Sequence, residues 1–305
     1  MDNLAFIFPG QGSQYVGMGK DLYNDFPSAK KRFDQANEIL DFDLFKVTFE
    51  GPEDKLANTR FTQPAIFVHS YAVFEILEES GYSAGMTAGH SLGEYSALAA
   101  AGVFDFEQGI RLVQQRGKLM QNAGNQTKGT MAAIIGLDFQ TIHNLCQQAS
   151  RSALVDVANF NSPQQIVISG TLAGVEKVME SAKKAGARRI VPLNVSAAFH
   201  SPLMRSVVDE FARELNKIAF REANVPVFSN VSGQATTDPD EIKMFLEKQL
   251  LSPVLWTDTV KHMIQGGATV MFEVGPGKVL SGLVRKIDKQ LKVMQLGTSQ
   301  DLRTL

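Results

Sequence analysis

The sequence predicts an α/β protein built on a mainly parallel sheet. Apolar runs of strand length alternate with segments of helical periodicity in the first half of the chain, starting with a strand at 4–8 and helices at 28–40 and 64–80. Of the 305 residues, 44% are hydrophobic and 20% are charged, which is typical of a globular protein with a sizeable core. We therefore expect one large domain, with room for an insertion.

A tight turn follows these first elements. An apolar run ends at Ala88, Gly89 and Gly93 flank the turn, and 94–101 has the periodicity of a helix. A further helix is expected at 108–122. A strand that turns sharply into a helix is a common position for a functional side chain.

The middle of the chain has a different order of elements. Strand, helix, strand, strand, helix and strand are expected in turn at 131–135, 139–149, 154–159, 165–169, 172–185 and 189–194. This β-α-β-β-α-β order is a split βαβ arrangement and predicts an inserted small subdomain. The preceding segment 122–129 is rich in Gly, Asn, Gln and Lys and is therefore expected to be a linker.

Alternating helices and strands resume after the small subdomain. We expect these elements at 203–218, 225–230, 241–250 and 270–274. The predicted division is a small subdomain at 128–196 and a large subdomain formed by 1–127 and 197–305.

Charge and hydropathy argue against several classes of protein. The chain has 30 basic and 32 acidic residues, a net charge of -2 that gives no reason to expect binding to nucleic acid or to an anionic membrane. No segment approaches a membrane span, and the apolar run 4–8 lacks the basic leader of a signal peptide. We expect a cytoplasmic protein, with a near-neutral chain that is compatible with a monomer. The single cysteine, Cys146, cannot form an internal disulfide. Its side chain is expected to pack beside apolar neighbours on a predicted helix.

Ser91 is the candidate nucleophile. It stands at the centre of Gly-His-Ser-Leu-Gly over 89–93, a form of the G-x-S-x-G pattern in which a tight turn exposes the serine hydroxyl. The helix that follows directs its first N–H groups toward a developing oxyanion, and the backbone N–H of Leu92 is the natural first donor. The alternative is a chance match in a turn that contains glycine. Because a strand precedes the motif and a helix follows it, we favour a covalent ester on Ser91.

A serine nucleophile needs a base, and the chain has five histidines. His90 is adjacent to Ser91, and adjacent side chains on a sharp turn point apart, so a packing role is expected for it. His200 stands at the end of a strand pattern and just before a helix, where functional residues gather in open α/β sheets. The alternative is that His200 caps the following helix. No acidic residue stands out as a third member, so a backbone carbonyl is a candidate to orient the imidazole. The other three histidines fall on predicted helices: His69, His143 and His262.

Arg116 occupies an unusual position on its predicted helix. At about 100° per residue, the apolar residues of 108–122 gather on one half of the helix, and Arg116 projects into the middle of that half. A buried guanidinium must be paired, because an unpaired buried charge costs several kcal/mol. One interpretation is a salt bridge to an internal Asp or Glu. The other is a fork that binds the carboxylate of a substrate.

The loop at 8–14, Phe-Pro-Gly-Gln-Gly-Ser-Gln, follows the first strand. It does not fit a nucleotide-binding loop, because Tyr15 stands where the dinucleotide pattern needs glycine and the Lys-Ser/Thr pair of the Walker pattern is missing. A plain turn is one interpretation. The functional alternative is a flexible loop that supplies a backbone N–H, for example that of Gln11, to a neighbouring oxyanion.

Six motifs in this order resemble the malonyl-CoA:acyl carrier protein transacylases, and the resemblance spans nearly the whole chain. They are PGQGSQ at 9–14, TQPA at 62–65, GHSLGE at 89–94, QRG at 115–117, FHSPLM at 199–204 and EVGPG at 273–277. The resemblance implies an α/β-hydrolase-like large subdomain and a ferredoxin-like small subdomain. The β-α-β-β-α-β segment agrees with the second of these.

The resemblance also implies a role for each candidate residue. The implied roles are Ser91 as nucleophile, His200 as base, Arg116 as carboxylate clamp, the N–H groups of Gln11 and Leu92 as oxyanion hole, and the carbonyl of Gln249 as the group that orients the histidine. Met120 and Phe199 are expected to line the substrate pocket. Leu92 and Phe199 resemble malonyl-selecting members, in which bulky residues disfavour a methyl branch; such packing discriminates by only about 1–3 kcal/mol.

The implied reaction moves a malonyl group from malonyl-CoA to Ser91, and then to the phosphopantetheine thiol of an acyl carrier protein. The carrier protein is expected to be acidic and to bind transiently. No bound cofactor is implied, and no spacing of His, Cys and carboxylates resembles a metal site. The alternative on the same scaffold is a hydrolase that clears acyl groups from carrier proteins. Fatty-acid and polyketide synthesis would require the same site, so both pathways stay open.

Overall fold

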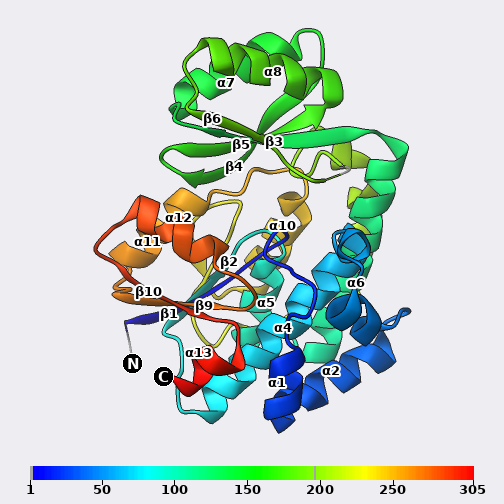
Figure 1. Ribbon diagram of the computed structural model, residues 1–305, viewed down its shortest axis with the longest axis vertical. Helices are drawn as coiled ribbons and strands as arrows, with labels where there is room; N and C mark the ends of the chain where they lie inside the picture. Colours follow the sequence, from blue (N-terminus) through cyan, green and yellow to red (C-terminus); the bar gives the residue numbers. More distant parts are fainter. Residues whose placement is uncertain (1–2, 196) are drawn as a thin grey trace.

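The computed structural model describes residues 3–195 and 197–305, which form two β-sheets (Figure 1). The larger sheet has six strands in the order β10-β9-β1-β2-β7-β8, and the smaller sheet has four in the order β4-β5-β3-β6. The strands of the larger sheet are β1 (Leu4–Phe8), β2 (Met86–Gly89), β7 (Val227–Phe228), β8 (Ala235–Thr236), β9 (Val270–Val274) and β10 (Lys292–Leu296). Those of the smaller sheet are β3 (Gly129–Ile135), β4 (Val155–Ser162), β5 (Gln165–Thr171) and β6 (Arg189–Pro192).

Strand β1 lies at the centre of the larger sheet, with β9 on one side and β2 on the other, and pairs in parallel with both. Phe6 and Phe8 pack into the core on one face of the sheet, and Ala5 and Ile7 pack into the core on the other. A strand buried on both faces needs a continuous apolar sequence. Because β1 and β2 are parallel, their carboxyl ends lie at the same edge of the sheet, where both lead into loops.

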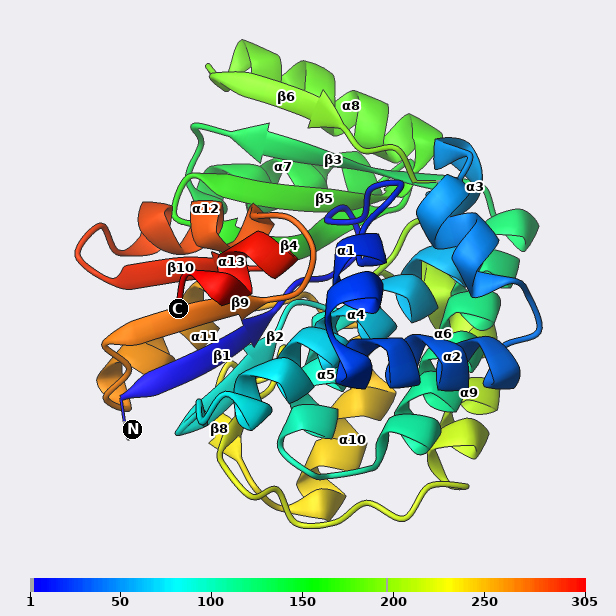
Figure 2. The same ribbon diagram turned by 60° about the horizontal axis from the view of Figure 1, so that its bottom comes forward.

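Helices cover both faces of the larger sheet (Figure 2). On the face of Phe6 and Phe8, α2, α4 and α6 pack side by side, and α11 and α12 cover the other face. The helices before the small sheet are α1 (Lys20–Asp25), α2 (Pro27–Ile39), the π-helical turn η1 (Lys46–Glu50), α3 (Glu53–Leu56), α4 (Thr59–Glu79), α5 (Gly93–Ala100) and α6 (Phe106–Gln126). Those after it are the 3₁₀ turn η2 (Pro202–Val207), α9 (Val208–Leu215), α10 (Pro239–Gln249), α11 (Trp256–Gln265), α12 (Val279–Ile287) and α13 (Ser299–Arg303).

The smaller sheet carries α7 (Phe139–Ser150) and α8 (Leu172–Lys184) on its outer face (Figure 1). Side chains of β3 alternate between the two faces: Ala132 and Ile134 pack under these helices, whereas Met131 and Ala133 join the core of the large part. All three strand pairs are antiparallel. The inner face of this sheet therefore covers the edge at which β1 and β2 end.

The predicted α/β class is confirmed, and the predicted β-α-β-β-α-β order matches the elements from β3 to β6. The division into 1–127 with 197–305 and 128–196 stays a prediction, which the separation of the two sheets along the chain supports. Met1, Asp2 and Ser196, which that division includes, lie outside the described residues.

The predicted linker at 122–129 is wrong. Helix α6 continues to Gln126, and only two residues separate it from β3. Buried Ala123 and Gly124 anchor the last turn to the core, while exposed Asn and Gln side chains are compatible with a helix surface. The polar composition of this segment therefore reflects mainly the exposed surface of a helix end.

Three other predicted elements have different bounds. The helix expected at 64–80 begins at Thr59, because the side chain of Asn58 caps it by accepting from the N–H of Arg60 at 3.1 Å. The helix expected at 203–218 is divided into η2 and α9. The strand expected at 225–230 is only Val227–Phe228, since Pro226 has no N–H to donate to the sheet.

Close approach between β1 and the turn after β2 depends on glycine. A Cβ atom on Gly93 would lie 2.0 Å from the carbonyl oxygen of Phe8, and one on Gly10 would lie 2.3 Å from the carbonyl oxygen of His90. Backbone atoms cannot give way as a flexible side chain can. The two glycines thus bring the loop after β1 against the turn that carries Ser91.

Replacing Gly93 by alanine should lower the free energy of unfolding by about 2 kcal/mol or more, because the new Cβ would force β1 and the turn apart. Gly282→Ala is the matched control: Gly282 lies in α12, and nothing lies within 4 Å of its added Cβ. That control should be neutral or stabilised by up to about 1 kcal/mol. Urea unfolding of both variants checks this, and equal stability of the two would contradict it.

Candidate active site

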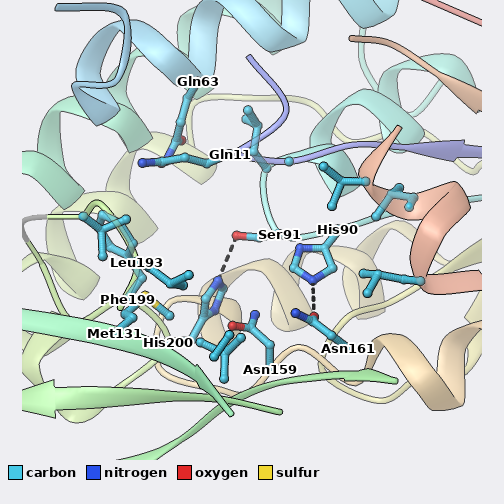
Figure 3. A pocket seen from close by; sticks show the side chains of 18 of the residues that line it. Gln11, Gln63, His90, Ser91, Met131, Asn159, Asn161, Leu193, Phe199 and His200 are labelled. Atoms are coloured by element: carbon cyan, nitrogen blue, oxygen red, sulfur yellow. Dashed lines mark hydrogen bonds between the residues drawn. The ribbon is translucent and has the colours of Figure 1, made fainter. Parts of the chain in front are cut away.

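Ser91 lies on the turn between β2 and α5 and faces a pocket between the two sheets (Figure 3). Its φ of 51° is in the left-handed region, which a serine adopts only when the surrounding structure holds it there. This conformation projects the side chain away from the strand and the helix. The observed turn therefore has the predicted geometry, in which a sharp turn exposes the serine hydroxyl to the pocket.

Asn230 holds this turn in place. Its Oδ1 accepts from the backbone N–H of Ser91 at 2.7 Å, and its Nδ2 donates to the carbonyl oxygen of Gly89 at 2.6 Å. The side chain is fully buried just after β7, so these two bonds are made away from water. Asn230 therefore stabilises the strained backbone on both sides of the turn.

His200 is placed to act as the base for Ser91. The distance from its Nε2 to Ser91 Oγ is 2.8 Å (Figure 3), and its Nδ1 lies 2.9 Å from the carbonyl oxygen of Gln249 and 3.1 Å from that of Ser252. Carbonyl oxygens only accept, so the proton of the neutral ring belongs on Nδ1. Nε2 is then free to accept the proton of the Ser91 hydroxyl.

The backbone around His200 shows that this residue does not cap the following helical turn. The cap of η2 is Ser201, whose Oγ accepts from the N–H of Leu203 at 3.2 Å. His200 itself has a φ of 55°, which directs its side chain into the pocket instead. Burial and the nearby positive charge of Arg116 lower the pKa of His200 to about 3, so the ring is uncharged at neutral pH.

Arg116 is fully buried beside the serine, as its place on the apolar half of the helix predicts. Its Nη1 donates to Gln63 Oε1 at 2.8 Å, and its Nη2 donates to Gln249 Oε1 at 2.9 Å and to Ser91 Oγ at 3.1 Å. The guanidinium also lies 5.0 Å from the centre of the Tyr95 ring. Among the described residues no carboxylate lies within 4.0 Å of it, so the salt-bridge interpretation is not the observed geometry.

Gln249 joins several parts of the site. Its carbonyl orients His200, its Oε1 accepts from Arg116, and its Nε2 donates to Ser91 O at 3.1 Å and to Glu94 Oε2 at 2.6 Å. Burial raises the pKa of Glu94 to about 7, against the lowering effect of the hydrogen bond from Gln249. The carboxyl group of Glu94 is thus separated from the guanidinium of Arg116 by the side chain of Gln249.

Gln11 and Leu92 line the pocket next to Ser91. Within the described part of the chain, neither backbone N–H has a hydrogen-bond acceptor, while the Gln11 side chain is held by a bond from its Nε2 to Thr59 Oγ1 at 3.2 Å. Two free N–H groups beside a nucleophile are the arrangement that stabilises an oxyanion. Their assignment as the oxyanion hole stays a prediction that this placement supports.

Met120 and Phe199 also line the pocket, as expected. Met120 Sδ accepts from Gln63 Nε2 at 3.3 Å, which ties the pocket wall to the amide that holds Arg116. The remaining walls come from the smaller sheet and from α12, through residues such as Met131, Val167 and Leu283. The pocket therefore has an apolar wall and one buried positive charge near its nucleophile.

His90 also lines the pocket but does not contact the serine hydroxyl. Its Nε2 lies 2.8 Å from Asn161 Oδ1 (Figure 3). The centre of its ring lies 5.6 Å from that of Trp256. This agrees with the expected packing role. Among the residues that the structure describes, no group of three or more His, Cys, Asp or Glu side chains is arranged to hold a metal ion.

Three functional side chains were not expected from the sequence: Gln63, Glu94 and Asn230. Gln63 and Glu94 are polar residues on otherwise buried stretches of α4 and α5, so the periodicity argument that identified Arg116 would also have selected them. Asn230 follows a strand of two residues, and nothing local in the sequence marks it.

Comparison with known proteins agrees with this geometry. The acyl transferase domain family matches residues 5–299. The malonyl CoA-acyl carrier protein transacylase of Bacillus subtilis (strain 168) is 44% identical, over 99% of this chain and 96% of its own. The chain belongs to the malonyl-CoA:acyl carrier protein transacylase family. The relative of that name from Escherichia coli (strain K12) is 46% identical, over 94% of this chain and 93% of its own.

Solved structures of this family share the fold. An acyl carrier protein S-malonyltransferase from Vibrio cholerae superposes with a TM-score of 0.95 at 43% identity, and covers 99% of both chains. A malonyl-transacylase in complex with a type II polyketide synthase acyl-carrier protein has the same TM-score at 41% identity, over 99% of this chain and 98% of its own. None of the helices described here is long and apolar enough to cross a membrane.

The free energy of unfolding should rise with pH between about 4 and 6.5, in part because of His200. The folded protein keeps this ring uncharged down to a pKa of about 3, whereas in the unfolded chain it protonates near 6.5, so acid favours the unfolded state. The contribution has a slope of up to about 1.4 kcal/mol per pH unit. Urea unfolding at several pH values should show a shallower slope for His200→Gln, and an unchanged slope would contradict the buried neutral ring.

Proposed function

We propose that this enzyme transfers the malonyl group from malonyl-CoA to the phosphopantetheine thiol of an acyl carrier protein, through an ester on Ser91. The observation that carries the proposal is the buried Arg116, which donates to the nucleophile and has no carboxylate partner among the described residues. A guanidinium can bind a substrate carboxylate with two parallel hydrogen bonds. The names of the relatives, which act on malonyl CoA and acyl carrier protein, support the same substrates.

In the first half-reaction, His200 Nε2 takes the proton of Ser91 while Oγ attacks the thioester carbonyl of malonyl-CoA. The carbonyl oxygen becomes negatively charged and is stabilised by the N–H groups of Gln11 and Leu92. When this intermediate collapses, the carbon–sulfur bond breaks, and the CoA sulfur leaves with the proton from His200. The product is malonyl-Ser91, with its carboxylate held by Arg116.

The second half-reaction reverses these steps with a different thiol. The phosphopantetheine thiol of the carrier protein gives its proton to His200 and attacks the ester carbonyl, and Ser91 leaves as its alcohol after taking that proton back. A hydrolase would use water in place of this thiol. Because the pocket is shared by both half-reactions, CoA must leave before the carrier protein's arm enters.

Hydrogen bonds from His200 Nδ1 to Gln249 O and Ser252 O keep the ring in the required tautomer, so the site needs no acidic third residue. The low pKa of His200 makes its neutral form available across the neutral range. Leu92, Met120 and Phe199 form the pocket wall and are proposed to disfavour a methyl branch on the substrate. The Arg116 contact supplies the larger preference, for an acyl group that bears a carboxylate.

The same transfer would supply fatty-acid or polyketide synthesis. The relative solved in complex with a type II polyketide synthase carrier protein is 41% identical to this chain. The Bacillus subtilis relative named for malonyl transfer is 44% identical. We propose a cytoplasmic location for this transfer.

Incubated with malonyl-CoA and no acceptor thiol, the protein should gain the mass of one malonyl group, because Ser91 forms the ester and water reacts slowly. Ser91→Ala should gain none. Ser96→Ala is the control, since Ser96 lies on the helix that follows and its buried Oγ has no hydrogen-bond partner among the described residues. Intact-protein mass spectrometry makes the measurement. An adduct that persists in Ser91→Ala would contradict the assignment, and rapid release of free malonate without an acceptor would favour the hydrolase.

Arg116→Ala should lower kcat/KM for malonyl-CoA by at least about a hundredfold, because two charge-assisted hydrogen bonds to the substrate carboxylate are lost. Transfer from acetyl-CoA, which lacks that carboxylate, should be kept or increased. Arg111→Ala is the control on the exposed face of the same helix, where Arg111 pairs with Glu107 at 2.9 Å. Steady-state kinetics with both donors decide the matter, since an equal loss of both activities would mean that Arg116 is structural.

A further inference from the structure

Glu94 is a buried acid that the mechanism above does not use. It is only 3% exposed, on the first turn of α5, and within the described residues it has no cation within 4.0 Å. Its Oε2 accepts from Gln249 Nε2 at 2.6 Å and from the backbone N–H of Asn230 at 3.3 Å. A carboxylate in such a place costs free energy unless its hydrogen bonds hold something that the protein needs.

The side-chain amide of Gln249 lies between groups of opposite hydrogen-bonding character. Arg116 can only donate, and it points Nη2 at Gln249 Oε1; an ionised Glu94 can only accept, and it takes a hydrogen bond from Gln249 Nε2. Turning the amide by half a rotation would set N–H against N–H at Arg116 and oxygen against oxygen at Glu94. While Glu94 is ionised, the two charged groups therefore permit one orientation of the amide.

This orientation matters for the guanidinium. Arg116 is held by two amide oxygens, those of Gln63 and Gln249, and Gln249 Oε1 is the one on the Nη2 side, next to Ser91. If the amide turned, Nη2 would keep only Ser91 Oγ as an acceptor, and the guanidinium would be held less firmly beside the acyl group. When it is ionised, Glu94 also balances the buried positive charge across the amide, at a distance that leaves the guanidinium available to a substrate.

We propose that Glu94 is a positioning residue for Arg116, acts through the side-chain amide of Gln249, and thereby determines the preference for malonyl over acetyl groups. This inference rests on the proposed malonyl transfer. Glu94 touches neither the substrate nor the reacting atoms. Its second contact, to the N–H of Asn230, supports the turn of Ser91 and would affect both acyl groups alike.

The contacts of Glu94 with Gln249 and with Asn230 can be separated by kinetics with malonyl-CoA and acetyl-CoA. Glu94→Gln keeps the size of the side chain but removes the acceptor-only group, so kcat/KM for malonyl-CoA should fall about tenfold or more while that for acetyl-CoA changes much less. Glu273→Gln is the matched control, because Glu273 is fully buried and accepts from the N–H groups of Leu280 and Ser281 instead. Its malonyl-to-acetyl ratio should equal that of the wild-type protein.

A double-mutant cycle tests the route through Gln249. Gln249→Met removes the side-chain amide but keeps the backbone carbonyl that orients His200, and alone it should lower the malonyl-to-acetyl ratio. In that background Glu94→Gln should change the ratio by less than about twofold. Each of three results would overturn the proposal. The first is that the effects of the two substitutions on the ratio multiply in the double variant. The others are an unchanged ratio in Gln249→Met and an equal loss of both activities in Glu94→Gln. Should Glu94→Gln fail to fold, an unchanged ratio in Gln249→Met alone would still overturn the proposal.

The outcome is distinguishable from failure of the proposed function. A wild-type protein that forms no malonyl ester on Ser91 would refute the transferase itself. A wild-type protein that forms the ester, with a cycle that gives multiplicative effects, would refute only the role of Glu94.

Discussion

The buried guanidinium of Arg116 is the constraint around which this site is arranged. A positive charge removed from water needs hydrogen-bond acceptors, and the fold supplies them as neutral amides from two other helices, Gln63 on α4 and Gln249 on α10. Among the described residues no carboxylate contacts the guanidinium, so an incoming substrate carboxylate displaces none. The same charge helps to keep the ring of His200 neutral, which is the form a general base requires.

The catalytic serine depends on a second constraint, the close packing of backbone against backbone at the edge of the larger sheet. Glycine at positions 10 and 93 allows the loop after β1 to lie against the turn after β2, and Asn230 holds the left-handed residue at the centre of that turn. The loop that carries Gln11 thus reaches the nucleophile because it leaves the central strand of the sheet. The smaller sheet then closes the pocket from the opposite side.

Local patterns in the sequence predicted those features that local physics determines. The turn around Ser91, the burial of Arg116 and the order of elements from β3 to β6 all follow from short-range periodicity and turn chemistry. Contacts between distant segments did not follow: Asn230 is 139 residues from Ser91 along the chain, and Glu94 meets Gln249 across 155. The linker prediction failed because composition does not reveal that Ala123 and Gly124 are buried against the core. The family resemblance, not the residues alone, supplied the carbonyl partner of His200.

Selective malonyl transfer by this site requires that the acyl group on Ser91 be held by its carboxylate. A crystal structure of the wild-type protein soaked with malonyl-CoA, in the absence of an acceptor thiol, tests this most directly. We expect electron density for a malonyl ester on Ser91 Oγ, with both carboxylate oxygens within hydrogen-bond distance of the Arg116 guanidinium and the ester carbonyl oxygen facing the N–H groups of Gln11 and Leu92. An ester whose carboxylate points to solvent, with Arg116 still bound only to Gln63 and Gln249, would contradict it.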